Sequence, residues 1–247
     1  MGIDVRTADG IAEVVIGFPP VNALPAQGWS DLASAVTAAG ADPAVRAVVL
    51  AADGRGFCAG VDIKEMQRTP GHEALLGANR GCYAAFAAVY DCPVPVIAAV
   101  HGFCLGGGVG LAGSADIVIA SDDATFGLPE VDRGALGAAT HLARLVPQQL
   151  MRAMVYTCQT VTAQQLLSFG TVLSVVPADR LRAAARDLAG QIADKEPSII
   201  RAAKQSLNGI DPVDIKRSYR YEQGFTFELN LTGVSDAARD AFTDGQR

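Results

Sequence analysis

The sequence has little charge and no basic tract. Lys, Arg, Asp and Glu together make up 19% of its 247 residues, and the formal net charge is −6. Proteins that bind nucleic acid need a positively charged surface for the phosphate backbone. We therefore predict no nucleic-acid partner. Half of the residues are apolar, which is enough to build a substantial core.

Cysteine and histidine are also scarce, with five and three residues respectively. No two cysteines form a C-x-x-C pair, and most of them have apolar neighbours. The odd number and the irregular spacing favour reduced thiols in a cytoplasmic protein. No His/Cys cluster has the spacing of metal ligands, so we predict no metal site. The five cysteines are Cys58, Cys82, Cys92, Cys104 and Cys158.

An apolar signal core is missing from the first residues, and no membrane partner is predicted. The stretch between Asp91 and Asp116 contains no charged residue and is long enough to cross a bilayer. Two prolines, a histidine and clustered glycines interrupt it, however. They divide it into a strand, a loop and the start of a helix.

Strands and helices alternate through the first two-thirds of the chain, which predicts an α/β fold with a largely parallel sheet. We expect a core over residues 1–192 and a helical region over 193–247. Expected strands span 5–7, 11–17, 45–51, 94–100, 116–120, 125–127 and 173–176, the first two forming a hairpin; expected helices span 25–39, 72–90, 180–193, 197–207 and 214–231.

Two glycine-rich loops each follow a buried strand and lead into a helix. One is His101–Gly110, with the run Gly106-Gly107-Gly108, and the other is Asp53–Gly60. If both lie at the same end of the sheet, the N–H groups of Ala59 and Gly107 can converge on one oxygen as an oxyanion hole. Residues 108–113 also fit G-x-G-x-x-G, but seven residues separate them from the strand, which argues against a dinucleotide site.

Several motifs together resemble the crotonase (enoyl-CoA hydratase/isomerase) superfamily over essentially the whole chain. The resemblance implies a crotonase (ClpP-like) spiral of ββα units with a C-terminal helical region that forms homotrimers, often paired into hexamers. The motifs are Pro20-Val21-Asn22-Ala23-Leu24, the run from Gly56 to Met66, Val94–Gly102 continuing into Gly106-Gly107-Gly108, and Phe126-Gly127-Leu128-Pro129-Glu130.

The same resemblance implies roles for individual residues. Ala59 and Gly107 hold the thioester oxygen of an acyl-CoA substrate, and Glu130 matches the second catalytic glutamate of hydratases. Coenzyme A is then part of the substrate, and no prosthetic group is expected. The residues expected to contact it are Asn22, Ala23, Leu24, Ala59, Gly60, Val61, Asp62 and Gly107.

One departure from the family pattern limits the chemistry. Hydratases carry their first glutamate where this chain has Gly110, and dienoyl isomerases use a position that is Ala138 here. Glu130 is thus left with Asp132 and His141 as possible catalytic helpers, although Asp132 can equally be an ion-pair partner and His141 a core residue. We also predict that Gly110 leaves room for a bulky acyl group.

Within the superfamily, residues 130–142 and 221–229 are most similar to hydrolases of steroid breakdown that open a ring. These enzymes cleave a carbon–carbon bond of a bicyclic diketone CoA thioester, a reaction for which one carboxylate suffices. Two alternatives stay open: an enoyl-CoA hydratase or isomerase acting on a bulky 2-enoyl-CoA with one carboxylate, and a catalytically silent acyl-CoA-binding protein.

Overall fold

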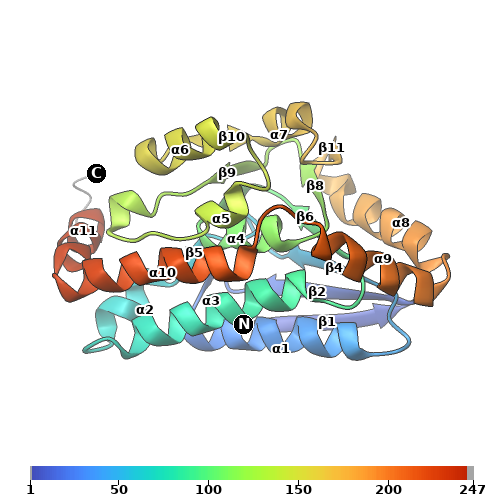
Figure 1. Cartoon of the computed structure of the whole chain (residues 1–247), viewed down its shortest axis with the longest axis horizontal. Coiled ribbons are helices and arrows are strands. Elements are labelled where there is room, and N and C mark those ends of the chain that lie inside the picture. The colour runs from blue at the N-terminus through green and yellow to red at the C-terminus, as the bar shows by residue number, and fades with distance from the viewer. Residues whose placement is uncertain (1, 244–247) are drawn as a thin grey trace.

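A six-stranded sheet forms the centre of the protein, in a computed structural model that describes residues 2–243 (Figure 1). Its order is β1-β2-β4-β6-β8-β11, and every neighbouring pair is parallel except the β1–β2 hairpin. The predicted hairpin and parallel sheet are therefore confirmed. The strands are β1 (Gly2–Ala8), β2 (Ile11–Gly17), β4 (Ala47–Ala52), β6 (Val96–Val100), β8 (Ile117–Ser121) and β11 (Ser174–Val176).

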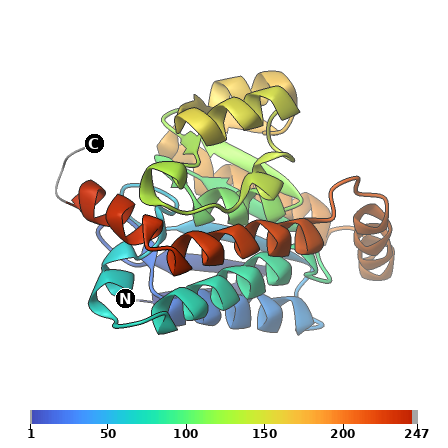
Figure 2. The same cartoon turned by 60° about the vertical axis from the view of Figure 1, so that its left-hand side comes forward.

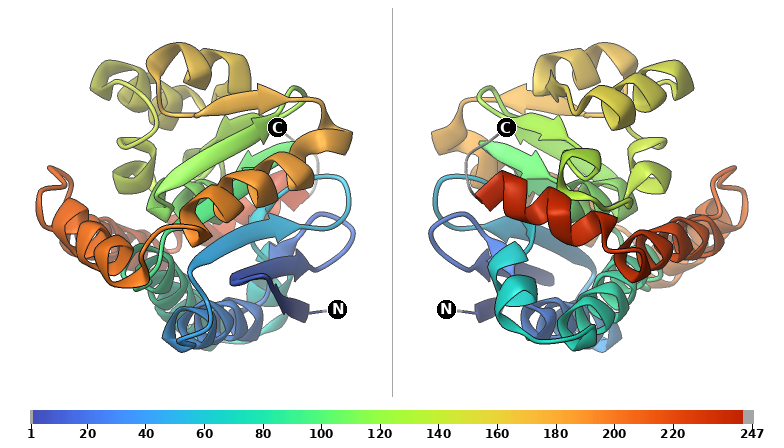
Figure 3. Two further views of the ribbon diagram at one scale, coloured as in Figure 1. Left: turned by 90° about the vertical axis from the view of Figure 1, so that its right-hand side faces the viewer. Right: turned by 90° about the vertical axis from the view of Figure 1, so that its left-hand side faces the viewer.

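Both faces of the sheet are buried, because helices cover each of them (Figure 3). In β4, Val48 and Leu50 pack toward α1 (Ala26–Ala41) and α3 (Glu73–Tyr90), whereas Ala47 and Val49 pack toward α8 (Leu181–Ala193). Successive side chains of a strand point to opposite faces, so a strand covered on both sides is apolar throughout. This explains the continuous apolar runs in the sequence.

Segments that follow the strands of the main sheet form two smaller sheets. One joins β10 (Thr160–Thr162), β9 (Thr125–Gly127) and β7 (Phe103–Leu105), and the other is the parallel pair β3 (Ala23–Leu24) and β5 (Gly60–Val61). They bring segments distant in sequence together beside α4. The short helices of this region are α2 (Ile63–Arg68), α4 (Gly107–Ser114), η1 (Val131–Arg133), α5 (Ala139–Leu142), α6 (Gln148–Thr157) and α7 (Ala163–Phe169).

The C-terminal part is helical, as predicted. After η2 (Ala178–Arg180) and α8, the chain forms α9 (Pro197–Gly209), α10 (Ile215–Leu231) and α11 (Val234–Thr243). Helix α9 stands away from the body of the molecule, whereas α10 lies across α3 and α5, and α11 contacts η1 (Figure 2). None of the helices within 2–243 is both long and apolar enough to cross a membrane. The division at residue 192 stays a prediction.

Candidate active site

The two glycine-bearing loops predicted to meet do lie against each other. The N–H of Leu105 donates to the carbonyl of Cys58 at 2.8 Å. A Cβ atom on Gly60 would lie only 3.2 Å from the backbone nitrogen of Gly107. The start of α4 is therefore in van der Waals contact with β5, a contact that the short main-chain hydrogen bond between the loops maintains.

Gly106 joins this loop to the glutamate. It has φ of +56°, a conformation that side chains with a Cβ rarely adopt, and its N–H donates to Gly127 at 3.0 Å. A Cβ here would lie 2.5 Å from Oε1 of Glu130. Because only glycine leaves this space, the carboxylate of Glu130 can rest directly beside the loop.

The carboxylate of Glu130 is shielded from bulk solvent. Its Oε2 atom is buried and has no hydrogen-bond partner among the described residues. Loss of water around the carboxylate raises its pKa to about 8, although the positive charge of Arg133 opposes that rise. A carboxyl group whose pKa lies near neutral pH can exchange protons with a substrate or a water molecule.

Two main-chain segments, the start of α4 and β5, line the same pocket. Gly107 begins α4, so its N–H has no partner within the helix and lies at the positive end of the helix dipole. The predicted role of Ala59 does not agree with the structure, because its N–H donates to the carbonyl of Asn22 at 3.2 Å. The N–H of Asp62 also points toward β3, where it donates to Leu24 at 2.9 Å.

The geometry favours Val61 over Ala59 as the second donor. Successive N–H groups along an extended strand point to opposite edges. Gly60, with φ of +92°, interrupts the extended backbone after Ala59, so the alternation is followed only from Asp62. Since the N–H of Asp62 points to β3, we infer that the N–H of Val61 points to the other edge of β5, toward the pocket that Val61 lines. Residue spacing alone did not distinguish these two positions of the loop.

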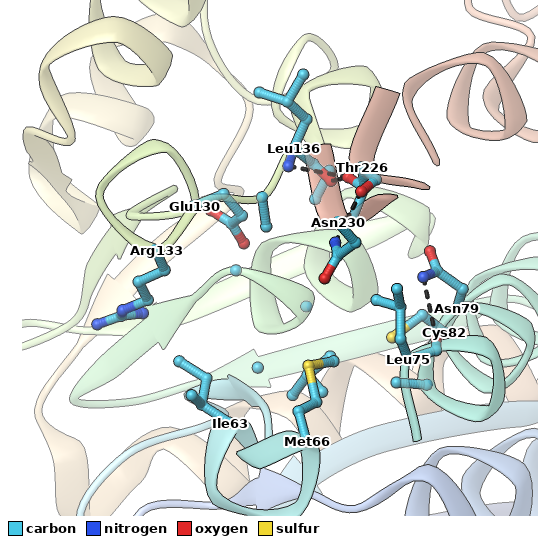
Figure 4. A pocket seen from close by; sticks show the side chains of 18 of the residues that line it. Ile63, Met66, Leu75, Asn79, Cys82, Glu130, Arg133, Leu136, Thr226 and Asn230 are labelled. Atoms are coloured by element: carbon cyan, nitrogen blue, oxygen red, sulfur yellow. Dashed lines mark hydrogen bonds between the residues drawn. The ribbon is translucent and has the colours of Figure 1, made fainter. Parts of the chain in front are cut away.

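A mainly apolar pocket opens in front of these groups (Figure 4). It contains about 810 Å³ when its open mouth is counted, a size typical of small-molecule sites. Glu130 and Asn230 project into it from one side, facing Ile63 and Met66 on the other. Its further lining residues include Ala59, Gly60, Val61, Leu75, Ala78, Cys82, Phe86, Gly107, Arg133, Leu136, Gly137, Tyr219, Thr226 and Arg239.

Gly110 does not widen this pocket, contrary to our expectation. A Cβ at this position would lie 2.2 Å from the ring of Phe86, which is itself buried. The aromatic ring from α3 fills the space that a side chain would have occupied on α4. The space that the first glutamate of hydratases would occupy is therefore filled by the Phe86 ring. Gly137 is the more open position, because a Cβ atom there would lie no nearer than 3.7 Å to the Tyr219 ring.

Several predicted residues lie outside the pocket lining and hold its surroundings together. The side chain of Asn22 donates to the carbonyls of Asp53 and Gly56, at 2.7 and 2.9 Å. Ala23 and Leu24 form β3, and Asp62 caps α2 by accepting from Lys64 at 2.9 Å. These four residues therefore shape the loop. Asp132 is exposed on η1 and interacts with the Cys158 thiol.

His141 lies behind the pocket wall. Its ring packs edge-on against Phe86 and Tyr219, with centroid distances of 4.7 and 5.1 Å. Burial, with the nearby charge of Arg144, lowers its pKa to about 3, and Nδ1 has no partner among residues 2–243. These surroundings are those of a neutral core histidine, because they disfavour the protonated form.

We expect His141→Phe to keep most of the catalytic activity, since the aromatic packing is preserved. The unfolded chain binds a proton near pH 6.5, whereas folded His141 binds it only near pH 3. Stability is therefore lost as the pH falls through this window, and the variant should lose less of it. Urea denaturation between pH 4 and 7 measures this. A drop in turnover matching that of a Glu130 variant would instead make His141 a proton carrier.

The C-terminal helices bring to the pocket several residues that were not predicted from the sequence. Tyr219, Thr226 and Asn230 line it from α10, and Arg239 lines it from α11. A signal was present, because residues 219, 223, 226 and 230 repeat at helical spacing and all are buried. Three of the four are polar, so the repeat does not look like an ordinary core stripe.

Residues 2–243 contain no group of three or more His, Cys, Asp or Glu arranged to hold a metal ion. Beside the two loops, the site offers main-chain N–H groups and the carboxylate of Glu130, in a pocket whose walls are mainly apolar. This arrangement can stabilise negative charge on a carbonyl oxygen while one group moves a proton. It defines a site for acyl chemistry with a single acid or base.

The fold and this site place the chain among crotonase-fold proteins. Residues 6–226 match the enoyl-CoA hydratase/isomerase family, and the chain belongs to that family. A solved structure of an enoyl-CoA hydratase/isomerase from Xanthobacter autotrophicus Py2 superposes with a TM-score of 0.88 at 28% identity, covering 99% of this chain and 92% of that one. The predicted fold class is thereby confirmed.

Two bacterial hydrolases are considerably more similar in sequence. The (7aS)-7a-methyl-1,5-dioxo-2,3,5,6,7,7a-hexahydro-1H-indene-carboxyl-CoA hydrolase of Rhodococcus jostii (strain RHA1) is 64% identical over 245 residues, covering 99% of this chain and 95% of that protein. The hydrolase of the same name from Mycobacterium tuberculosis is 64% identical over 233 residues, which is 94% of each chain.

Proposed function

We propose that this protein is an acyl-CoA hydrolase that opens the five-membered ring of a bicyclic diketone CoA thioester from steroid breakdown. The observation that carries the proposal is the 64% identity to two hydrolases of this kind across nearly the whole chain. The site chemistry supports it, because ring opening by water needs one carboxylate and a means of stabilising an enolate.

Glu130 is the general base of this reaction. Its carboxylate takes a proton from a water molecule as the water oxygen attacks the ring ketone carbon. The tetrahedral intermediate then collapses, and the bond between the former ketone carbon and the ring-fusion carbon breaks. The ketone carbon becomes a carboxylic acid, and the bonding electron pair passes through the conjugated enone to the thioester oxygen. Protonation of carbon completes the addition of one water.

The main-chain N–H groups of Gly107 and Val61 receive the charge on the thioester oxygen. They belong to α4 and β5, two regular elements that contact each other, so little reorganisation is needed when the charge develops. One such donor typically contributes about 2.7–4 kcal/mol to stabilisation of the transition state. The thioester then lies along Ala59, Gly60 and Val61, and coenzyme A is bound only as part of the substrate.

Mass spectrometry of the reaction products tests the proposal. We expect the bicyclic diketone CoA thioester to gain one water, and in H2(18)O the label should enter the new carboxyl group. Crotonyl-CoA, incubated in parallel, should stay unchanged. Rapid hydration of crotonyl-CoA would instead support an enoyl-CoA hydratase, and the absence of turnover with any thioester would indicate a silent acyl-CoA-binding protein.

We also propose that the protein assembles as a homotrimer or as a hexamer of two trimers. Large apolar side chains are exposed on the C-terminal helices and directly after α9, among them Ile199, Ile210 and Leu231 at 66%, 74% and 74%. An apolar surface of this kind is typical of subunit contacts. Ile199→Glu combined with Ile210→Glu should shift the mass measured by light scattering toward a monomer. Unchanged mass would exclude these side chains from the contact.

A further inference from the structure

Two neighbouring polar residues from the C-terminal helices line a pocket whose wall is mainly apolar. Asn230 on α10 and Arg239 on α11 both line the pocket, and their exposed fractions are only 6% and 9%. Figure 4 shows the Asn230 amide directed into the pocket, on the same side as Glu130 and across from Met66. In a pocket of this kind, a few polar groups fix the orientation of the ligand.

The hydrogen bonds leave part of the Arg239 guanidinium available. Its Nη2 atom donates to Oδ1 of Asn230 at 3.0 Å and also to the carboxylate of Asp236, whose side chain is 69% exposed. The amide nitrogen of Asn230 donates to the carbonyl of Thr226 at 2.7 Å, which orients its oxygen. A guanidinium has five N–H groups, and those on Nε and Nη1 donate to no residue between 2 and 243.

We infer that Arg239, held by Asn230, recognises an oxygen at the end of the acyl group remote from the thioester. The inference rests on the proposed function for the identity of that oxygen: it is the ring ketone before water attacks and the carboxylate afterwards. A buried guanidinium suits both, because it donates to a carbonyl and pairs in two-point fashion with a carboxylate. The site thereby selects acyl groups that carry a distal oxygen.

The location of Arg239 separates this task from stabilisation of the enolate. The main-chain donors at Gly107 and Val61 serve the thioester oxygen. Arg239 lines the pocket from α11 where it adjoins a second hollow, which is also lined by Met66, Leu75 and Asn230 but not by Gly107 or Val61. A substrate with two oxygen functions is thus held at both ends. An acyl group without the distal oxygen leaves a buried cation without a ligand partner, which weakens binding.

Binding of simple CoA thioesters tests the inference without any ring opening. Calorimetry compares the binding of adipyl-CoA, which has a terminal carboxylate, with that of hexanoyl-CoA, which has the same chain length but no carboxylate. A shorter pair, succinyl- and butyryl-CoA, and a longer pair, suberyl- and octanoyl-CoA, vary the distance between the thioester and the carboxylate. In the wild type we expect the best acid to bind about tenfold more tightly than its matched partner, which corresponds to about 1.4 kcal/mol. Arg239→Gln should abolish this preference, and Arg239→Lys should retain part of it.

Arg186→Gln on α8, where Arg186 pairs with the exposed Asp9, is the matched control and should leave the preference unchanged. If Arg239→Gln fails to fold, Asn230→Leu removes the acceptor that holds the guanidinium and should reduce the preference. The inference would be overturned if the wild type bound each acid and its matched partner equally well. It would also be overturned if the variants weakened the binding of both thioesters of a pair by the same factor. Lack of ring opening would contradict the proposed hydrolase but would not affect this comparison.

Discussion

Glu130→Gln is expected to lower kcat for ring opening by about 10²–10⁴-fold, the usual contribution of a general base. Glutamine has nearly the same shape but cannot accept the proton of the attacking water. The change also leaves the loop at Gly106 intact, since Gln places an atom where Oε1 lies now. Binding of the CoA thioester should therefore persist. Single-turnover kinetics with calorimetric binding separate the two effects.

The pH dependence should report the same group. A general base must be ionised, so kcat/KM should rise with pH and level off above the Glu130 pKa of about 8. The folded protein keeps this proton between its ordinary pKa of 4.5 and about 8, whereas the unfolded chain releases it. Stability should therefore fall as the pH rises through this window, and Glu130→Gln should remove that loss.

Glu73→Gln, at an exposed position in the first turn of α3, is the matched control for both measurements. It should change neither kcat nor the pH profile. Wild-type turnover in Glu130→Gln would exclude Glu130 as the base. A pH profile that is flat between 6 and 9 would show that a group other than this carboxylate limits the reaction.

Gly110→Ala is expected to lower the free energy of unfolding by about 3 kcal/mol, at the upper end of what overpacking a core commonly costs. The added methyl group would lie 2.2 Å from the Phe86 ring, and that ring also contacts Trp29, His141 and Tyr219. Since none of these rings can move alone, the strain is shared by the whole cluster. Chemical denaturation at constant pH measures the change.

Gly190→Ala provides a matched control, because Gly190 lies inside α8 and nothing approaches its notional Cβ within 4 Å. That change should stabilise the protein slightly, by up to about 1 kcal/mol. Combining Gly110→Ala with Phe86→Leu should recover part of the lost stability, since the smaller side chain leaves room for the methyl group. Equal stability of Gly110→Ala and the wild type would mean that the Phe86 ring is not tightly held.

The strands and glycine loops were predictable because their signals are local. Buried strands such as β4 and β6 are continuous apolar runs, and the glycines mark the points where two backbones approach each other closely. The second main-chain donor was predicted to be Ala59, whereas the structure favours Val61, two residues further along the same loop. Residue spacing places a loop but does not tell which N–H a neighbouring strand has already engaged.

The sequence by itself determined the family, the parallel sheet and the presence of one carboxylate, Glu130, after Leu128-Pro129, because each depends on residue types at short spacing. Only the tertiary structure decided the surroundings of these residues. Burial raises the pKa of Glu130, Phe86 fills the space beside Gly110, and α10 and α11 bring Asn230 and Arg239 to the pocket. These properties depend on contacts between segments far apart in the sequence, since residues from Ala59 to Arg239 line one pocket, and no local pattern encodes such contacts.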